Sequence, residues 1–186
     1  MRSQTPSTAH VVILVGIPGA GKSFFAEYFA KAFNAPLVNV HTIAQTLDID
    51  ETAAFKVGDM LLGELFKTGR TIVYEGPTST KQQRKDIAKR VASAGYQPLF
   101  VWVQTESSTA KSRVARKTHA GKRLTGSEFE EQVRAFQAPT EKEKCLVISG
   151  KHTFSSQLRV VLKHLVGPRA QVQQNRPASD RQAPFR

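Results

Sequence analysis

The sequence predicts an α/β protein built of three layers, in which a five-stranded parallel sheet is covered by helices on both faces. Two observations support this fold class. Short apolar runs rich in β-branched residues alternate along the chain with segments of helical periodicity. The chain has 186 residues, of which 40 % are hydrophobic, so it is large enough to form one domain around a core. Right-handed crossovers then place the carboxyl ends of the strands, and a binding site, along one edge.

The first predicted strand, residues 11–15, is followed at once by a glycine-rich loop and a helix. Residues 16–23 read GIPGAGKS and match the pattern G-x-x-x-x-G-K-[ST]. The helix carries Phe25, Phe29 and Phe33 at i, i+4, i+8 spacing, as expected of a helix with one apolar face. The pattern binds phosphate in this strand–loop–helix context. The alternative is an ordinary glycine-rich turn into a core helix, which the agreement of pattern, strand and helix disfavours.

Each residue type in this loop suits a triphosphate. Glycines let the backbone curl so that successive N–H groups point at phosphate oxygens, and the start of the helix adds unpaired donors. Lys22 is expected to reach the β- and γ-phosphates, and the Ser23 hydroxyl to bind Mg²⁺. The predicted cofactors are therefore ATP and Mg²⁺. The residues expected to contact the nucleotide are Gly16, Ile17, Pro18, Gly19, Ala20, Gly21, Lys22, Ser23 and Phe24.

Further strands and helices follow in alternation. The strands are predicted at residues 37–40, 71–75, 99–103 and 145–148. The helices are predicted at 51–68, 80–94, 107–117 and 157–166, with one more that opens at the capping-box pattern of Ser127 and stops at Pro139. In the helix at 51–68, Val57, Leu61 and Leu65 lie on one face. The folded domain is expected at 10–166, after a flexible start at 1–9 and before a disordered basic tail at 167–186.

Glu75 ends the predicted strand 71–75 and precedes a glycine. A carboxylate at the end of a neighbouring strand can hold a metal-bound water or polarise the attacking group, so Glu75 is a candidate metal-binding and catalytic residue beside Ser23. The alternative is a surface glutamate at a strand end.

Arg113 and Arg116 are three residues apart and therefore share a helical face. Their guanidinium groups could close over a triphosphate and neutralise charge that develops during phosphoryl transfer. The neighbouring segment HAGKRLTG suits a lid that excludes water, which we expect at about residues 107–138. A solvated basic helix is the alternative.

The net charge of +12 is unevenly distributed. Residues 81–123 carry eleven Lys and Arg against two acidic residues. A basic face favours phosphate-rich partners, including nucleic acid. A kinase lid with a solubilising tail would produce the same charge, and the sequence leaves both readings open.

The sequence also indicates the cellular environment of the protein. No apolar run approaches the roughly 20 residues that cross a bilayer, and the N-terminal segment does not read as a signal peptide. Cys145 is the only cysteine, so no intrachain disulfide is possible, and its apolar neighbours favour a buried small hydrophobe over a reactive thiol. A reducing, cytoplasmic setting is the expectation.

The motifs together resemble a known family. GIPGAGKS, the strand TIVYEG, and RVAR followed by a variable loop look like the small P-loop kinases of the zeta-toxin and polynucleotide-kinase type, often labelled AAA-type ATP-binding domains. The resemblance covers about residues 10–166. It implies a nucleoside-kinase-like P-loop NTPase fold, ATP and Mg²⁺ as cofactors, and transfer of the γ-phosphoryl group to a hydroxyl. The family's roles fall on Lys22 and Ser23 at the phosphates and metal, and on Arg113 and Arg116 in the lid.

The sequence departs from this family after the second strand. Family members commonly have an Asp there as the presumed base, with an Arg three residues later, and here His41 and Ala44 stand at those places. Glu75 also stands where an Asp is usual. A neutral imidazole could act as base near pH 7, or His41 could be a remnant in a site that has lost or changed its substrate. Asp48 and Asp50 are a further source of carboxylate.

Two functions are compatible with these features. The first is an ATP-dependent kinase that acts on a hydroxyl of a nucleic-acid end or of a small metabolite. The second is a nucleotide-dependent nucleic-acid-binding or regulatory ATPase with little kinase activity, which the missing Asp and Arg favour. ATP is expected rather than GTP, because the chain lacks the guanine-reading sequence N-K-x-D.

Overall fold

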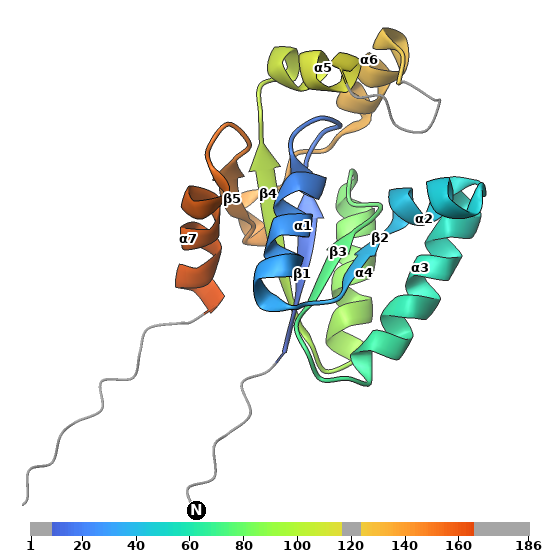
Figure 1. The fold of residues 1–186 in the computed structure, drawn as a ribbon, viewed down its shortest axis with the longest axis vertical. Helices are drawn as coiled ribbons and strands as arrows, with labels where there is room; N and C mark the ends of the chain where they lie inside the picture. Colours follow the sequence, from blue (N-terminus) through green and yellow to red (C-terminus); the bar gives the residue numbers. More distant parts are fainter. Residues whose placement is uncertain (1–8, 117–123, 166–186) are drawn as a thin grey trace, which may run out of the picture.

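The computed structural model describes residues 9–116 and 124–165, which form one five-stranded sheet flanked by helices (Figure 1). The strands are all parallel and lie in the order β2-β3-β1-β4-β5. They are β1 (His10–Val15), β2 (Leu37–Asn39), β3 (Ile72–Glu75), β4 (Gln97–Gln104) and β5 (Leu146–Ser149). The helices are α1 (Lys22–Phe33), α2 (Val40–Leu47), α3 (Glu51–Phe66), α4 (Lys81–Ser93), α5 (Ser107–Arg116), α6 (Gly126–Ala135) and α7 (Phe154–Leu165). The predicted fold class is confirmed.

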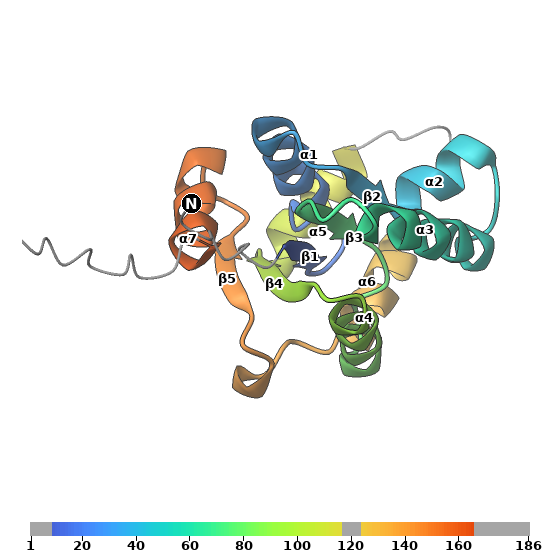
Figure 2. The same ribbon diagram turned by 90° about the horizontal axis from the view of Figure 1, so that it is seen from below.

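The central strand β1 is apolar and buried from Val11 to Val15, because the sheet is covered on both faces. Its side chains alternate between two cores. Val12 and Leu14 face α1 and α7, where they pack with Phe25 and Phe29. Val11 and Ile13 face α3 and α4, where Leu62 is among their buried neighbours. Figure 2 shows α1 and α7 on one side of the sheet and α4 on the other.

The helix α2 was not predicted. The expected strand 37–40 ends one residue early at Asn39, whose side chain caps the new helix by accepting a hydrogen bond from the Thr42 N–H at 3.1 Å. Helix α3 also turns a different face to the core than expected. Its buried residues are Ala54, Gly58 and Leu62, and Leu61 is exposed. Gly58 permits this packing, since a Cβ there would lie 3.2 Å from Val40.

Helix α6 also begins differently from the prediction. Its capping box is formed by Thr125 and Glu128, two residues before the pair expected at Ser127. With Thr125 as the cap, Phe129 falls in the first turn and is buried, which fixes the start of the helix. Helices α5 and α6 fold from the predicted lid segment and lie together above the carboxyl edge of the sheet (Figure 1).

Three predicted features fall partly or wholly outside the described residues. These are the flexible start at 1–9, of which residue 9 alone is described, the loop HAGKRLTG at 119–126, of which residues 124–126 are described, and the tail at 167–186. Within residues 9–116 and 124–165, every helix is too short or too polar to span a membrane.

Cys145 is half-buried, and burial raises the pKa of its thiol to about 11.

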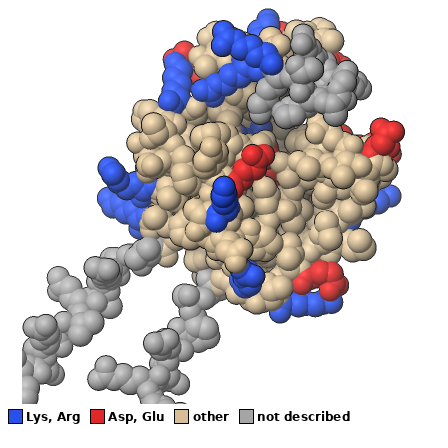
Figure 3. Space-filling model, in the orientation of Figure 1, with Lys and Arg blue, Asp and Glu red and all other residues tan. Residues whose placement is uncertain are grey.

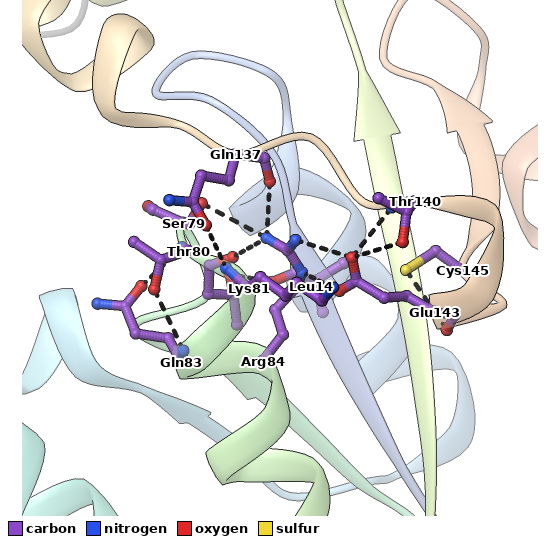
Figure 4. Close-up of polar contacts among 11 residues, drawn as sticks. Leu14, Ser79, Thr80, Lys81, Gln83, Arg84, Gln137, Thr140, Glu143 and Cys145 are labelled. Carbon is purple, nitrogen blue, oxygen red and sulfur yellow. Dashed lines mark hydrogen bonds and ion pairs between the residues drawn. The ribbon is translucent and has the colours of Figure 1, made fainter.

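One basic side chain of the stretch 81–123 is buried. Arg84 is 2 % exposed, and its Nε donates to the Glu143 carboxylate at 2.6 Å (Figure 4). Its Nη1 donates to the backbone carbonyls of Thr78 and Gln137, at 3.0 and 2.8 Å. The Thr78 hydroxyl in turn donates to the Leu14 carbonyl of β1 at 2.9 Å. Arg84 therefore joins the chain leaving α6 to the loop after β3, and it is not available to bind nucleic acid.

The buried ion pair predicts a large effect on stability. Arg84→Met leaves the Glu143 carboxylate without its partner, and we expect the free energy of unfolding to fall by about 3 kcal/mol. The hydrogen bond from Arg84 lowers the pKa of Glu143 from 4.5 to about 2. The pair therefore stabilises the fold above about pH 4.5, and this contribution is lost as the pH falls towards 2. Denaturant unfolding of wild type and variant across this range measures both effects.

Lys111→Met is the matched control. The Lys111–Glu130 pair has the same 2.6 Å separation, but both side chains are about half exposed. We expect little change from this variant, because exposed pairs contribute little. Equal losses from Arg84→Met and Lys111→Met would show that burial does not set the strength of the Arg84 pair.

Candidate functional site

The loop between β1 and α1 adopts a backbone that glycine allows. Gly19 and Gly21 have φ of 74° and 109°, in the left-handed region. Helix α1 begins directly after Gly21, and no side chain caps its first turn. Its N–H groups and the positive end of the helix dipole therefore face the loop, and this arrangement binds anions.

Lys22 and Ser23 begin α1 and extend in different directions. The Lys22 ammonium crosses the loop and donates to the carbonyls of Gly16 and Ile17, at 2.9 and 3.1 Å. The Ser23 hydroxyl donates to Oε1 of Glu75 at 2.9 Å. The predicted pairing of Ser23 with the carboxylate at the end of β3 is therefore present in the structure.

Asn39 completes this polar cluster. Its Nδ2 donates to Oε2 of Glu75 at 2.8 Å, and Glu75 is only 2 % exposed. The two residues are aligned partners at the ends of β2 and β3. The sequence motifs do not indicate Asn39. Each of two predicted strands ends in or near a polar residue, and this was the available signal. The sequence does not show that these two strands are neighbours in the sheet.

The cluster suits Mg²⁺ bound mainly through phosphate. Ser23 and Glu75 offer a hydroxyl and a carboxylate, the oxygen ligands that Mg²⁺ prefers. Among the described residues, no group of three or more His, Cys, Asp or Glu is placed to hold a metal. Ser23 and Glu75 would therefore hold the ion together with phosphate oxygens and water, as is usual for Mg²⁺ in phosphoryl-transfer sites.

Both predicted lid arginines reach the same cavity. It has a volume of about 470 Å³, and its lining includes Lys22, Ser23, Glu75, Arg113 and Arg116. Arg113 donates to the carbonyls of Gly150 and Ala20, at 2.9 and 3.3 Å, so it bridges the loop after β5 and the loop after β1. Two guanidinium groups, an ammonium and a helix N-terminus converge on the cavity, and this combination suits a triphosphate.

Some of the other residues that were predicted to contact the nucleotide line the cavity, and others do not. Phe24 lines the cavity at its rim and is 46 % exposed. Gly19 and Gly21 also line it, whereas Ile17 lines a separate hollow beside β4. The N–H of Ala20 donates to the Ile17 carbonyl across Pro18, which closes the turn of the loop.

His41 does not line the cavity. It lies in the first turn of α2, its side chain is 55 % exposed, and its Nδ1 is 3.6 Å from Oε1 of Glu51. Asp50 caps α3, and the hydrogen bond from the Ala53 N–H lowers the pKa of its carboxyl group. Asp48 is the exposed C-terminal cap of α2. None of these three side chains lines the cavity at the phosphate-binding loop, so the role of each as a general base stays a prediction.

One polar atom at the opposite wall lacks a partner. Gln157, in the first turn of α7, lines the cavity and is 3 % exposed. Its Nε2 donates to the Ser149 carbonyl at 2.8 Å, and this fixes the orientation of the amide. Its Oε1 is buried and has no hydrogen-bond partner among the described residues. A buried acceptor of this kind favours a ligand that brings a donor.

The fold and the loop define a P-loop NTPase with the architecture of small kinases. A family model described as an AAA domain matches residues 11–139, which is more than half of the chain. The chain therefore belongs to this AAA domain family. No curated protein matches it.

Solved structures share the fold at low sequence identity. A gluconokinase from Sinorhizobium meliloti 1021 is 15 % identical with a TM-score of 0.62, covering 86 % of this chain and 93 % of its own. The APS kinase CysC of Mycobacterium tuberculosis, in complex with AMPPNP and APS, is 15 % identical with a TM-score of 0.65, covering 87 % and 100 %. A chain of the Pnkp1/Rnl/Hen1 RNA repair complex is 22 % identical with a TM-score of 0.62, covering 72 % and 45 %.

The packing of α5 on the loop predicts a cost for a side chain at Gly19. A Cβ there would collide with the Ala110 carbonyl and lie 2.8 Å from Val114. Gly19→Ala should therefore displace α5 and weaken ATP binding by about tenfold or more, as measured by calorimetry.

Gly69→Ala is the control, because Gly69 has a similar φ of 65° but nothing within 4 Å of a Cβ. That variant should lose about 1 kcal/mol of stability and keep its ATP affinity. Unchanged ATP binding by Gly19→Ala would contradict the inferred contact between α5 and the loop.

Proposed function

We propose that this protein is an ATP-dependent phosphotransferase of the zeta-toxin and polynucleotide-kinase type. It transfers the γ-phosphoryl group of ATP to a hydroxyl of a small metabolite or a nucleic-acid end. The observation that carries the proposal is the contact of Ser23 with Glu75, beside Lys22 and beneath Arg113 and Arg116. A phosphate nest, a metal-binding pair and cationic side chains thus line one cavity.

The proposed roles follow from charge and position. Lys22 and the N–H groups of the loop hold the β- and γ-phosphates, and Arg113 and Arg116 neutralise charge on the transferring group. In the reaction, a bond forms between the acceptor oxygen and the γ-phosphorus, and the bond from that phosphorus to the β–γ bridging oxygen breaks. ADP leaves, and the proton of the hydroxyl passes to water or to a base. Positioning and charge neutralisation supply most of the rate in such a transfer.

Neither Glu75 nor His41 is poised as the general base for the acceptor hydroxyl. Both oxygens of Glu75 already accept hydrogen bonds, from Ser23 and Asn39. His41 would have to turn from Glu51 towards the phosphates, through a movement of α2. A weak or absent base would slow the transfer without abolishing it.

The exposed position of His41 also favours a second candidate function. A nucleotide-dependent nucleic-acid-binding or regulatory ATPase needs no base for an acceptor. The lid helices carry Lys111, Arg113, Arg116 and Arg134, and Figure 3 shows basic side chains gathered over them. On α4, Lys81, Lys85 and Lys89 are exposed at i, i+4, i+8 spacing and offer a further basic stripe.

Labelled ATP distinguishes the two candidates. The protein is incubated with Mg²⁺ and γ-labelled ATP against 5′-hydroxyl DNA, 5′-hydroxyl RNA and a metabolite pool. Label in any acceptor supports the phosphotransferase. If no acceptor is labelled and ADP release does not depend on one, while nucleic acid binds in a salt-dependent manner, the second function holds.

Glu75→Gln tests the metal-binding pair. We expect turnover to fall by about a hundredfold or more, because the carboxylate that would hold the metal is lost. ATP binding should persist, since the loop and Lys22 are unchanged. Turnover comes from the labelled-ATP assay and binding from calorimetry, with Glu27→Gln on the exposed side of α1 as the control. Full turnover by Glu75→Gln would remove Glu75 from the proposed mechanism.

Gln157 supports ATP over GTP. The strand order places the loop after β5 on the other side of β1 from Glu75, which leaves this end of the cavity for the base. Adenine has a donor amino group at the position where guanine has an acceptor oxygen, so the unpartnered Oε1 favours adenine.

Gln157→Met should therefore weaken ATP binding by about three- to tenfold and change GTP binding less. Calorimetry with both nucleotides measures the selectivity, and Gln45→Met on exposed α2 serves as the control. Equal affinities of the wild-type protein for ATP and GTP would contradict this role for Gln157.

A further inference from the structure

A second concave site lies on the other face of β3. A groove of about 570 Å³ runs between α3 and α4, and its lining includes Glu51, Asp59, Tyr74, Asp86 and Arg90. Nothing in the phosphate-binding mechanism uses these side chains. The groove is large enough for a small metabolite.

The floor of the groove contains a tyrosine hydroxyl group. Tyr74 is 2 % exposed and lines the groove. Burial, and then the charge of Asp59, raise the pKa of Tyr74 to about 12, so the hydroxyl stays neutral at pH 7. Gly76 makes room for it, because a Cβ at Gly76 would collide with the Tyr74 hydroxyl. A neutral hydroxyl that lines a groove is suited to bind a polar ligand.

The groove is acidic although the protein is strongly basic. Glu51, Asp59 and Asp86 face a single cation, Arg90, among its lining residues. Arg90 is already engaged, because its Nε lies 3.1 Å from Asp59 and its guanidinium group lies over the Phe66 ring. Asp86 accepts only from the neutral Gln82 amide, at 2.7 Å. The groove therefore has spare negative charge, which attracts cations and repels phosphate groups.

The groove and the phosphate cavity meet at the end of the same strand. Tyr74 lines one and the adjacent Glu75 lines the other, because successive side chains of β3 point to opposite faces. Pro77, just after the glycine, also lines the groove. A ligand in the groove thus lies next to the strand end that carries the proposed metal-binding carboxylate.

We infer that the α3–α4 groove binds the phosphoryl acceptor, and that this acceptor is a small hydroxyl compound with a positively charged amine. The inference rests on the proposed phosphotransferase function. The carboxylates receive the amine, the Tyr74 hydroxyl bonds a polar group of the ligand, and exposed Phe55 provides an apolar wall. The acceptor hydroxyl then extends past Gly76 towards the γ-phosphate. A nucleic-acid end does not suit this groove, because its phosphates would face the carboxylates.

A charge-matched panel tests this inference. Glucosamine, glucose and gluconate share a six-carbon hydroxylated chain and differ in charge, as the two-carbon compounds ethanolamine, ethylene glycol and glycolate do. A 5′-hydroxyl oligonucleotide is added, and transfer from γ-labelled ATP is measured. We expect kcat/KM to be about tenfold higher for a cationic member than for its neutral counterpart, and lowest for the anionic members. Preference for an anionic member or the oligonucleotide, or transfer to no cationic member, would overturn the inference.

Two variants test whether the groove causes the preference for a cationic acceptor. Asp86→Asn should raise the KM for the amine about threefold and leave the KM for the neutral compound unchanged. Tyr74→Phe should raise the acceptor KM about threefold, with the KM for ATP unchanged. Tyr28→Phe and Glu27→Gln, on exposed positions of α1, are the controls.

The outcomes also separate this inference from the proposed function. If an acceptor is phosphorylated but its KM is unchanged in Asp86→Asn and Tyr74→Phe, the groove is not the acceptor site. The proposed phosphotransferase function would still stand. Transfer to no acceptor in any panel would count against both. Asp86 is exposed, so Asp86→Asn remains informative if Tyr74→Phe fails to fold.

Discussion

The site depends on close backbone packing around the loop that follows β1. A Cβ at Gly16 would lie 2.7 Å from the Val103 carbonyl of β4, and one at Gly19 would collide with α5. The Ala20 carbonyl accepts hydrogen bonds from the Thr105 hydroxyl and from Arg113. The loop is therefore held from β4 and from α5, and its amide groups have little freedom to turn away from the cavity. Glycine is needed because no other residue permits such an approach at these backbone angles.

The strand order then divides the site into two sides. β1 lies between β3 and β4, so the loop after it separates the Glu75 cluster from the loop after β5. The side of β3 holds the carboxylate, Asn39 and the α3–α4 groove. The side of β5 holds Gly150 and the unpartnered Gln157 oxygen. In the proposed function the acceptor approaches from the β3 side and the nucleotide base lies on the β5 side, with the triphosphate between them. Arg84 connects the segment after α6 to the loop after β3 through its hydrogen bonds to the carbonyls of Gln137 and Thr78.

The fold and the centre of the site were predictable because their signals are local. The loop pattern lies between a strand and a helix in the sequence, and Arg113 and Arg116 share a face through helical spacing alone. Asn39 and Glu75 were harder to connect, because their contact depends on the pairing of β2 with β3. Arg84 was counted as surface charge because its partner, Glu143, lies 59 residues away in sequence. The position of His41 depends on α2, an eight-residue helix that follows β2 directly and is capped by Asn39.

Calorimetry of Mg·ATP binding tests the central claim most directly, namely that the backbone of residues 16–21 and the Lys22 ammonium form a polyphosphate site. We predict that wild-type protein binds Mg·ATP with one site per chain, and that Lys22→Ala weakens this binding by about tenfold or more. Folding of the variant is checked by its unfolding transition. Absence of heat with the wild-type protein, or equal affinities of the two proteins, would contradict the account.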